Sequence, residues 1–288
     1  MKYNFGMKQL YILYVGLACI VSSCNFINPD EQVPCYFKID SMSVSSNNIT
    51  QGSSSSHLTE AWVDVNDERA GAFPVPNTFP ILVSGSTNVV VSAGILDNGS
   101  SGTRTTYPFY NPYEITLSTE PTKIYELHPL FTYRALTKFP LIEDFELGNV
   151  FSKLSGDTIL NRISGTGQVY EGSNSGQIYL DDLHPSFEGK TLDEYVVTGS
   201  GSPVYIELDY KCNIPFTVGI YGISGLGNLT DYRWNINPKT DWNKIYLNLT
   251  DDVASMAADK YQIMIKASKA DSVSVGEIYL DNIKLLTY

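Results

Sequence analysis

The sequence predicts an all-β chain, built from an N-terminal β-sandwich followed by a C-terminal one. The composition favours strands and turns, with 20 Tyr and 12 Phe beside 22 Gly and 14 Pro. Apolar and polar residues alternate over short segments, as in half-buried strands. These segments recur about every ten residues, a spacing typical of sandwiches. With 43% hydrophobic residues over 288 positions, the chain is long and apolar enough to form about two domains, each with a buried core.

The first segment has the features of an export signal. Lys2 and Lys8 flank the start of an apolar run over 10–21, which is too short to span a bilayer that needs about 20 residues. We therefore expect a signal peptide over 1–23. The small residues before Cys24 resemble a bacterial lipoprotein signal, which implies acylation of Cys24 and stable attachment to a membrane. The alternative is an ordinary secretory signal in which Cys24 is incidental.

A short tether and two thiols follow. Prolines and acids over 24–34 discourage regular structure, so this segment is expected to link the anchor to the first domain. Cys35 and Cys212 lie in different predicted domains, and we expect them to be unpaired, with a disulfide as the alternative. The histidines are scattered and no Cys-x-x-Cys occurs, which argues against a zinc site.

Residues 35–138 are expected to form an immunoglobulin-like sandwich. In one segment Ala61, Val63 and Val65 alternate with polar or aromatic neighbours, which places them on one face of a strand. The stretch 62–95 resembles the small PEGA or carboxypeptidase-regulatory-like modules, which implies a structural or adhesive role without catalytic residues. The predicted strands span 36–44, 59–65, 70–75, 79–83, 88–96, 113–117 and 123–127.

An aromatic loop over 102–113 interrupts these strands. Tyrosine and arginine give large contact areas at low entropic cost, so the loop is a candidate protein-binding surface. The alternative is that its rings fill the end of the sandwich or the seam between domains. The candidate contact residues are Arg104, Tyr107, Phe109, Tyr110 and Tyr113.

Residues 139–288 are expected to form a second all-β domain. Its opening Glu-Asp-Phe-Glu at 143–146 and closing Tyr-Leu-Asp-Asn-Ile at 279–283 resemble the galactose-binding-like jelly rolls of carbohydrate-binding modules and bacterial surface proteins. The resemblance implies a fold, and such folds host many functions. The predicted strands span 139–146, 176–180, 195–197, 204–210, 216–221, 242–249, 261–267 and 276–285.

The same resemblance implies a structural calcium ion where the first and last strands meet. The matching ligands are Glu146 and Asp281, with Asp144 as a weaker candidate, and hard oxygen ligands suit Ca²⁺. The alternative is that these acids cap strand ends and pair with Lys or Arg. No other cofactor is expected.

Carbohydrate binding would need exposed aromatic rings beside polar groups. Tyr221, Tyr232 and Trp234 are available in the second domain, with Tyr232 and Trp234 as the main candidates, whereas Trp242 heads a strand and is expected in the core. The alternative for Trp234 is also the core, where a lone tryptophan in a sandwich usually packs.

Motifs for catalysis are absent from the sequence. It has no Gly-x-Ser-x-Gly, His-Glu-x-x-His or phosphate-binding glycine loop. Neighbouring acids on a strand point to opposite faces and cannot share one sugar. A formal charge of -12 argues against nucleic acid as a partner. We therefore expect no enzyme. Three Asp-Ser/Thr-apolar triplets resemble acceptors for O-glycans in Bacteroidota envelope proteins, at Ser41, Thr158 and Ser272.

The whole chain resembles a family of uncharacterised Bacteroidota outer-membrane lipoproteins. The features that carry this are the lipid signal, the domain order and the motifs at 59–65, 103–110, 143–146 and 279–284. The resemblance implies a lipid-anchored protein of the outer membrane, on the cell surface.

We expect a non-enzymatic subunit of a larger outer-membrane assembly, with a β-barrel protein or other lipoproteins as partners. The alternatives are a glycan-binding surface lipoprotein that feeds an uptake system, and an adhesin. Exposure of Tyr232 and Trp234 on one face would favour glycan binding, whereas an exposed loop over 107–113 would favour a protein partner.

Overall fold

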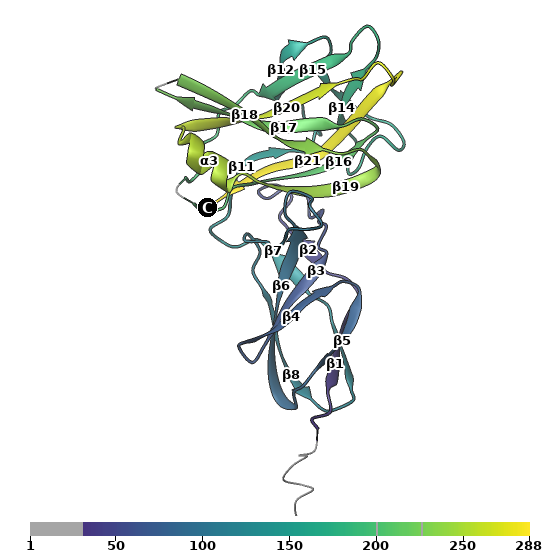
Figure 1. Cartoon of the computed structure of the whole chain (residues 1–288), viewed down its shortest axis with the longest axis vertical. Helices are drawn as coiled ribbons and strands as arrows, with labels where there is room; N and C mark the ends of the chain where they lie inside the picture. The colour runs from purple at the N-terminus through teal and green to yellow at the C-terminus, as the bar shows by residue number, and fades with distance from the viewer. Residues whose placement is uncertain (1–30, 200, 226) are drawn as a thin grey trace, which may run out of the picture.

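The computed structural model describes residues 31–199, 201–225 and 227–288. The predicted signal peptide, Cys24 and most of the tether lie outside these residues. The described chain is all-β and forms two sandwiches stacked end to end (Figure 1). Within this part of the chain, no helix combines the length and apolar character needed to cross a bilayer.

The N-terminal sandwich consists of two layers of short strands. One layer has the order β4-β3-β6-β7, and β8 also pairs with β6. The other has the order β5-β1-β9, continued by the pair β10-β2. The strands are β1 (Cys35–Ile39), β2 (Ser43–Ser45), β3 (Glu60–Val65), β4 (Glu68–Pro74), β5 (Asn77–Ile81), β6 (Gly85–Leu96), β7 (Arg104–Thr106), β8 (Tyr113–Thr119), β9 (Ile124–Leu127) and β10 (Leu130–Thr132).

Alternation of apolar residues explains most of these strands. Ala61, Val63 and Val65 of β3 are buried on one face, as the sequence predicts. The single strand expected over 36–44 is divided into β1 and β2. Its partner is divided in the same way, because Pro129 has no N–H to offer a strand and lies between β9 and β10. Both pairs run parallel.

The C-terminal sandwich stacks an inner sheet, which faces the N-terminal sandwich, on an outer sheet. The inner sheet has the order β13-β14-β21-β16-β19, with β11 also paired to β21, and the outer sheet has the order β12-β15-β20-β17-β18. Helix α3 (Thr250–Met256) links β19 to β20. The strands are β11 (Lys138–Glu143), β12 (Phe151–Gly156), β13 (Leu160–Ile163), β14 (Ser175–Leu180), β15 (Ser186–Thr191), β16 (Tyr205–Cys212), β17 (Phe216–Ser224), β18 (Gly227–Ile236), β19 (Lys239–Asn248), β20 (Lys260–Ser268) and β21 (Gly276–Thr287).

Two expectations for this half need correction. Residues 195–197 are not a strand, and Tyr195 makes only an isolated bridge to Tyr261. Strands β12, β13, β15 and β18 were not expected, because their polar and glycine-rich sequences carry little β signal. Each is held by pairing to a neighbour, so tertiary context decides its conformation. Cys35 and Cys212 are buried free thiols, in line with the expectation.

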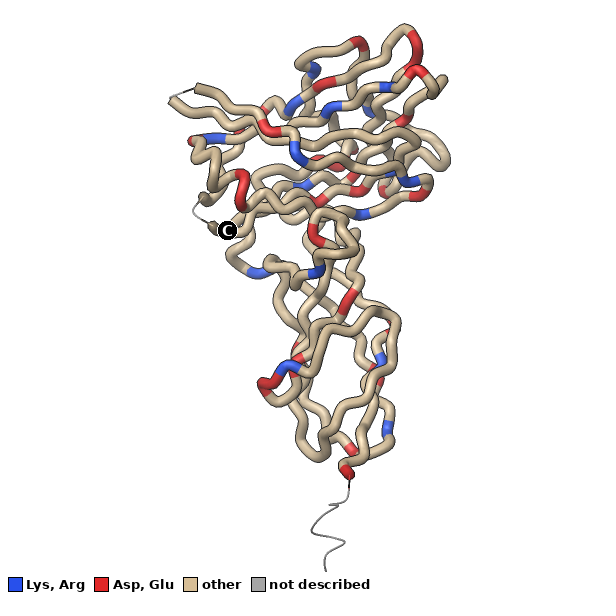
Figure 2. The backbone as a smooth tube through the Cα atoms, in the orientation of Figure 1, with Lys and Arg blue, Asp and Glu red and all other residues tan. Residues whose placement is uncertain are grey.

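The two faces of the C-terminal sandwich differ in what covers them. Strands β16 and β21 of the inner sheet are buried along both faces, because the N-terminal sandwich packs against their outward side. Tyr205, Tyr246 and Leu286 of this sheet belong to the hydrophobic core of the N-terminal sandwich. Acidic and basic residues are also present along the strands at this junction (Figure 2). The outward face of the outer sheet lies at the opposite end of the molecule (Figure 1).

Candidate functional site

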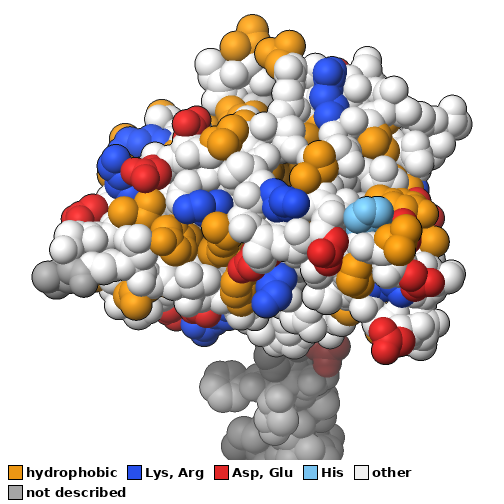
Figure 3. Space-filling view, turned by 90° about the horizontal axis from the view of Figure 1, so that it is seen from above, with side chains coloured by type: hydrophobic (Ala, Val, Ile, Leu, Met, Phe, Trp, Pro, Cys, Tyr) orange, Lys and Arg blue, Asp and Glu red, His pale blue; other side chains and the backbone are white. Residues whose placement is uncertain are grey.

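The outer sheet turns one face to the core and the other to solvent. In β17, Phe216, Val218 and Ile220 are buried in the core, whereas the alternating residues Thr217 and Tyr221 point outward and are partly exposed. We call the outward side chains of β15, β17, β18 and β20 the open face; its main members are Glu188, Lys190, Thr217, Tyr221, Tyr232, Asn235, Gln262, Met264 and Lys266. Lysine side chains lie among hydrophobic ones across it (Figure 3).

Strand register arranges the open face in rows that cross the sheet. The first row aligns Tyr221 with Gln262. The second row runs from Tyr232 through Gly219 and Met264 to Lys190. The third row runs through Thr217, Lys266 and Glu188, beside Asn235. Because neighbouring rows are two residues apart, they are about 7 Å apart along the strands.

Tyr232 lies across this face over a glycine. A Cβ atom on Gly219 would stand 2.8 Å from Cδ1 of Tyr232, so the ring occupies the space that a side chain at 219 would fill. The Tyr232 hydroxyl donates to Oε1 of Glu188 at 2.5 Å, which reaches across the two intervening strands. Nζ of Lys266 lies 5.4 Å from the ring centre. The ring is therefore held down at its hydroxyl end and partly exposed.

Tyr221 lies beside a second lysine. Nζ of Lys190 is 4.4 Å from the Tyr221 ring centre and donates to Oε1 of Gln262 at 2.8 Å. The amide of Gln262 is fixed in turn, because its Nε2 donates to the carbonyl oxygen of Thr191 at 2.6 Å. The orientation of the ammonium group is thus set by the sheet beneath it.

The chemistry available on the open face is recognition. Two aromatic rings offer apolar stacking surfaces, and the amide, carboxylate and ammonium groups beside them offer hydrogen bonds. Hydrogen bonds from Ser155 and Tyr232 lower the pKa of Glu188, so this carboxylate is ionised and accepts hydrogen bonds. A sugar-cleaving acid needs the opposite perturbation, a raised pKa.

The outward face of the inner sheet is occupied by the other sandwich. Glu207 accepts hydrogen bonds from the hydroxyls of Tyr107, at 2.6 Å, and Tyr133, at 3.1 Å. Nζ of Lys244 lies 3.6 Å from Glu207 and Nζ of Lys284 lies 3.8 Å from it. Buried charges need such partners. This network fills the centre of the seam between the sandwiches, and a pocket of about 280 Å³ at its edge is lined by His57, Lys244 and Tyr246 among others.

The aromatic loop over 102–113 forms part of that seam, which corrects its interpretation as a protein-binding surface. Tyr107, Phe109 and Tyr110 are at most 3% exposed. The rings of Tyr107 and Phe109 pack against Tyr205 of the inner sheet, and Tyr107 also packs against Tyr246. Tyr110 packs against Tyr107 and Tyr133, so the three rings bury their apolar area within the seam. The other two candidates lie at the edge of this region: Arg104 forms a 2.9 Å ion pair with Glu60, and Tyr113 is partly buried.

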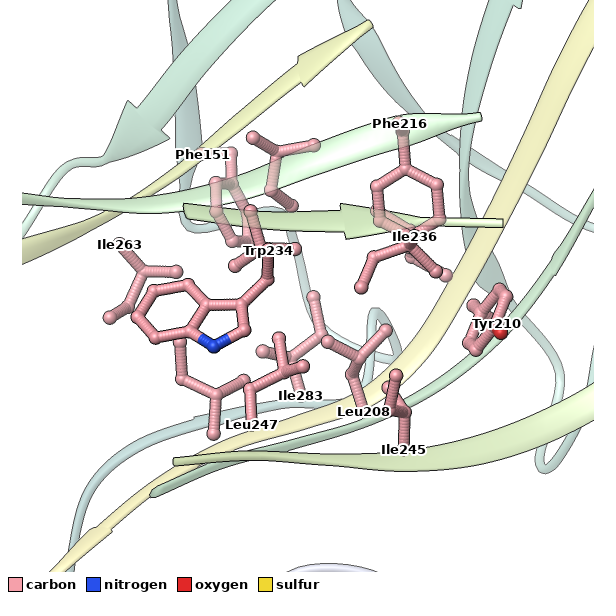
Figure 4. Close-up of a cluster of buried hydrophobic side chains, with 14 of the residues drawn as sticks. Phe151, Leu208, Tyr210, Phe216, Trp234, Ile236, Ile245, Leu247, Ile263 and Ile283 are labelled. Atoms are coloured by element: carbon pink, nitrogen blue, oxygen red, sulfur yellow. The ribbon is translucent and has the colours of Figure 1, made fainter. Parts of the chain in front are cut away.

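Trp234 lies in the core, which is the alternative expected for it from the sequence. Trp234 is 6% exposed and points between the sheets, where Leu247, Ile263 and Ile283 surround it (Figure 4). It is therefore a core residue and is removed from the candidate sugar-binding set. A β-bulge opposite Val218 and Gly219 places Tyr232 on the open face although it is two residues from Trp234.

Trp242, which was expected in the core, is partly exposed on the inner sheet. Its ring centre is 5.3 Å from that of Tyr170 and 6.5 Å from that of Tyr279. It therefore belongs to an aromatic cluster on the outward side of that sheet.

The two predicted calcium ligands line one pocket of about 280 Å³. Glu146 accepts hydrogen bonds from the backbone N–H groups of Ser173 and Asn174, at 2.7 and 2.9 Å. Asp281 accepts a 2.6 Å hydrogen bond from the hydroxyl of Ser175, and burial raises the pKa of Asp281 to about 6. In this arrangement both carboxylates accept hydrogen bonds from donor groups of the protein itself.

A guanidinium group lies beside this pocket. Nε of Arg162 donates to the carbonyl oxygen of Phe145 at 2.5 Å. Phe145 directly follows Asp144 in the chain. Among residues 31–199, 201–225 and 227–288, no three His, Cys, Asp or Glu side chains are grouped as a metal site requires. Asp144 and Glu171 line the same pocket, and calcium at Glu146 and Asp281 stays a prediction.

The predicted O-glycan acceptors lie outside the strands. Ser41 and Ser272 are exposed and Thr158 is partly exposed, each between elements. Their modification stays a prediction, as does lipidation of Cys24.

Sequence reasoning missed most of the open face. It identified Tyr232 and Tyr221 as aromatic residues available for binding, but not Lys190, Lys266 or Glu188. One signal was present: residues 260–268 alternate Lys, Gln, Met, Lys and Ser with apolar or aromatic residues, which marks a strand with a polar outward face. The pairing that brings these residues beside Tyr221 and Tyr232 is a long-range property of the fold.

Comparisons with known proteins add a likeness in fold. No family model and no curated protein matches the chain. Among solved structures, a carbohydrate-binding module from the β-sandwich superfamily, described for its promiscuous specificity, is 16% identical with a TM-score of 0.38 and covers 79% of this chain and 85% of its own.

Two further structures are similar over about half of the chain. The family 11 carbohydrate-binding module of Clostridium thermocellum, in complex with a β-1,3-1,4-mixed-linked tetrasaccharide, is 17% identical with a TM-score of 0.37 and covers 52% of this chain and 94% of its own. A family 61 module in complex with β-1,4-galactotriose is 12% identical with a TM-score of 0.35 and covers 50% of this chain and 94% of its own. At these sequence identities and TM-scores, the likeness indicates a β-sandwich fold and gives no information about a ligand.

Proposed function

We propose that this chain is a non-catalytic carbohydrate-binding protein that presents its open face to a glycan. The sugar rings stack on Tyr232 and Tyr221, and their hydroxyls exchange hydrogen bonds with Glu188 and Asn235. Sugars suit such a face because each ring has apolar C–H edges and polar hydroxyls, which match an aromatic ring flanked by donors and acceptors.

One observation carries this proposal. The Tyr232 ring lies over Gly219, where it takes the place of a side chain, and its hydroxyl is anchored on Glu188. A ring fixed in this way loses little conformational entropy when a ligand stacks on it. A tyrosine whose only role is to fill space would be expected to turn toward the core, as Trp234 does.

The molecule's length supports a role at a surface. The chain enters the N-terminal sandwich at one end, and the open face lies at the other (Figure 1). If Cys24 carries a lipid, the N-terminal sandwich acts as a stalk that holds the open face away from the membrane. We therefore propose a lipid-anchored surface protein of the outer membrane that captures glycans for an uptake system.

The role of a subunit in an outer-membrane assembly would have been favoured by an exposed aromatic loop. Because that loop is buried in the seam, it no longer favours a protein partner. A β-barrel partner stays a prediction, and it is compatible with glycan capture.

The test compares Tyr232→Ala with a matched control on a glycan array. Tyr179, which is 38% exposed on the inner sheet, provides the control Tyr179→Ala. We expect the native protein and the control to bind the same glycans, and Tyr232→Ala to lose the signal while its unfolding temperature shows that it is folded. Equal binding by Tyr232→Ala, or no binding to any glycan by the native protein, would refute the proposal.

A further inference from the structure

The open face carries more positive than negative charge at its centre. Lys190 and Lys266 lie there with a single carboxylate, that of Glu188. The other lysine on the outward side of β20, Lys260, is paired with Glu194 at 3.0 Å. The protein as a whole has a formal charge of -12, so the net positive centre of the open face has the opposite sign to the whole protein.

Neither of these two lysines is neutralised by direct contact. Half of the twelve Lys side chains in the described residues have a carboxylate oxygen within 4.0 Å of Nζ, and Lys190 and Lys266 belong to the other half. Nζ of each lies instead over a tyrosine ring, at 4.4 Å for Lys190 and 5.4 Å for Lys266. Glu188 directs its two oxygens to the hydroxyls of Ser155 and Tyr232.

Lys190 in particular is positioned before any ligand arrives. One of its N–H groups is directed to Gln262 and its charge faces Tyr221. An ammonium group has three donors, so donors remain for a ligand above the sheet. Its side chain is partly buried, which strengthens electrostatic attraction relative to a fully solvated charge.

We infer that the glycan bound by the open face is anionic and that Lys190 and Lys266 receive its carboxylate or sulfate groups. This inference rests on the proposed function, because it assigns the class of sugar that the same face binds. Lys266 is one strand over and two residues along from Lys190, which places the two Cα atoms about 8 Å apart. An acidic group carried by a sugar ring that stacks on Tyr232 lies within reach of either ammonium group.

The experiment measures binding of the purified protein to four polymers by affinity electrophoresis and calorimetry. Polygalacturonate carries free carboxylates, and its fully methyl-esterified form keeps the sugar and removes the charge. Chondroitin 4-sulfate carries sulfate groups, and unsulfated chondroitin keeps only the uronate. We expect a charged polymer to bind at least about tenfold more tightly than its less charged counterpart, the effect of one charge-assisted hydrogen bond. The polymer that binds identifies carboxylate or sulfate as the group received.

Two variants test whether the preference for a charged polymer depends on Lys190 and Lys266. Lys190→Gln with Lys266→Gln should remove the preference for the charged polymer, whereas Lys239→Gln, an exposed lysine off the open face, should leave it unchanged. Raising the salt concentration should weaken binding of the native protein more than that of the double variant, because salt screens charge.

The outcomes separate the two proposals. Binding of neutral glycans that equals binding of charged ones, with loss in Tyr232→Ala, would overturn the anionic class and leave the proposed function standing. A preference for charge that survives the double lysine variant would also overturn the inference. Absence of binding to these polymers and to a glycan array would overturn both proposals.

Discussion

Tyr107 and Glu207 lie a hundred residues apart, in different sandwiches, and their side chains are joined by a 2.6 Å hydrogen bond in the buried seam. Glu207 also lies beside Lys244 and Lys284, and Asp209 lies 3.4 Å from Lys244, so two acids balance two lysines. Burial raises the pKa of Tyr107 well above its usual value, which keeps the hydroxyl a donor. The relative position of the sandwiches is therefore held by a charged network as well as by apolar area.

Replacement of Glu207 should destabilise the whole protein. Glu207→Gln leaves two buried ammonium groups with one carboxylate, and removal of one partner from a buried pair costs about 3–5 kcal/mol. Chemical denaturation measures this loss. The control Glu126→Gln removes an exposed partner of Lys38 and should cost less than about 1 kcal/mol. Similar losses in the two variants would contradict the importance of the seam.

Lys284 should add to the stability of the protein as pH rises from about 8 to 10. Burial lowers the pKa of Lys284 to about 8 in the folded protein, against 10.5 when exposed. Over this range Lys284 holds more protons in the unfolded chain, so its contribution to the free energy of unfolding increases as pH rises. The buried thiols of Cys35 and Cys212 act oppositely within this range, and the buried tyrosines do so above pH 10, because burial raises their pKa values and keeps them protonated only when folded. The contribution of Lys284 is therefore the difference between the native protein and Lys284→Met in denaturation across this range; equal pH dependence of the two proteins would exclude it.

The two tryptophans should respond differently to truncation. Trp234→Ala opens a cavity between the sheets and should lower the free energy of unfolding by about 3–5 kcal/mol. Trp242→Ala removes a partly exposed ring and should cost clearly less. Folded protein from either variant should retain glycan binding, since neither ring is on the open face. Thermal unfolding and the glycan array measure both quantities, and loss of binding by folded Trp242→Ala would relocate the site to the inner sheet.

Gly219 should be required for the position of Tyr232. An added Cβ would stand 2.5 Å from the carbonyl oxygen of Asp231 and 2.8 Å from the Tyr232 ring, so Gly219→Ala must displace the strand or lift the ring. We expect at least about tenfold weaker glycan binding and lower stability, as overpacking costs about 1–3 kcal/mol. Gly199→Ala is the control, because nothing lies within 4 Å of its added atom. Unchanged affinity in Gly219→Ala would show that the ring's position over the sheet is unimportant.

Local patterns predict the all-β architecture and many of its strands. The alternation in β3 and β6 shows directly which residues face the core. Segments such as β15 and β18 could not be predicted in this way, because their polar residues become strands only through pairing with β20 and β17.

The candidate site is harder to predict because it depends on register. Tyr232 is outward and Trp234 inward because of a bulge in β18, which the sequence alone does not place. Likewise, Tyr107 is buried because its loop packs against the other sandwich. The composition of that loop would fit an exposed loop equally well. The chemistry of each residue is readable from the sequence, but its neighbours are not.

The shared core has a consequence for folding during synthesis. The N-terminal sandwich emerges first from the ribosome, yet its hydrophobic cluster includes Tyr205, Tyr246 and Leu286, which are made much later. Until β21 is translated, the apolar base of this sandwich is uncovered, and exposed apolar surface promotes aggregation. We therefore expect the N-terminal sandwich to complete its core only after the last strand of the C-terminal sandwich has been made.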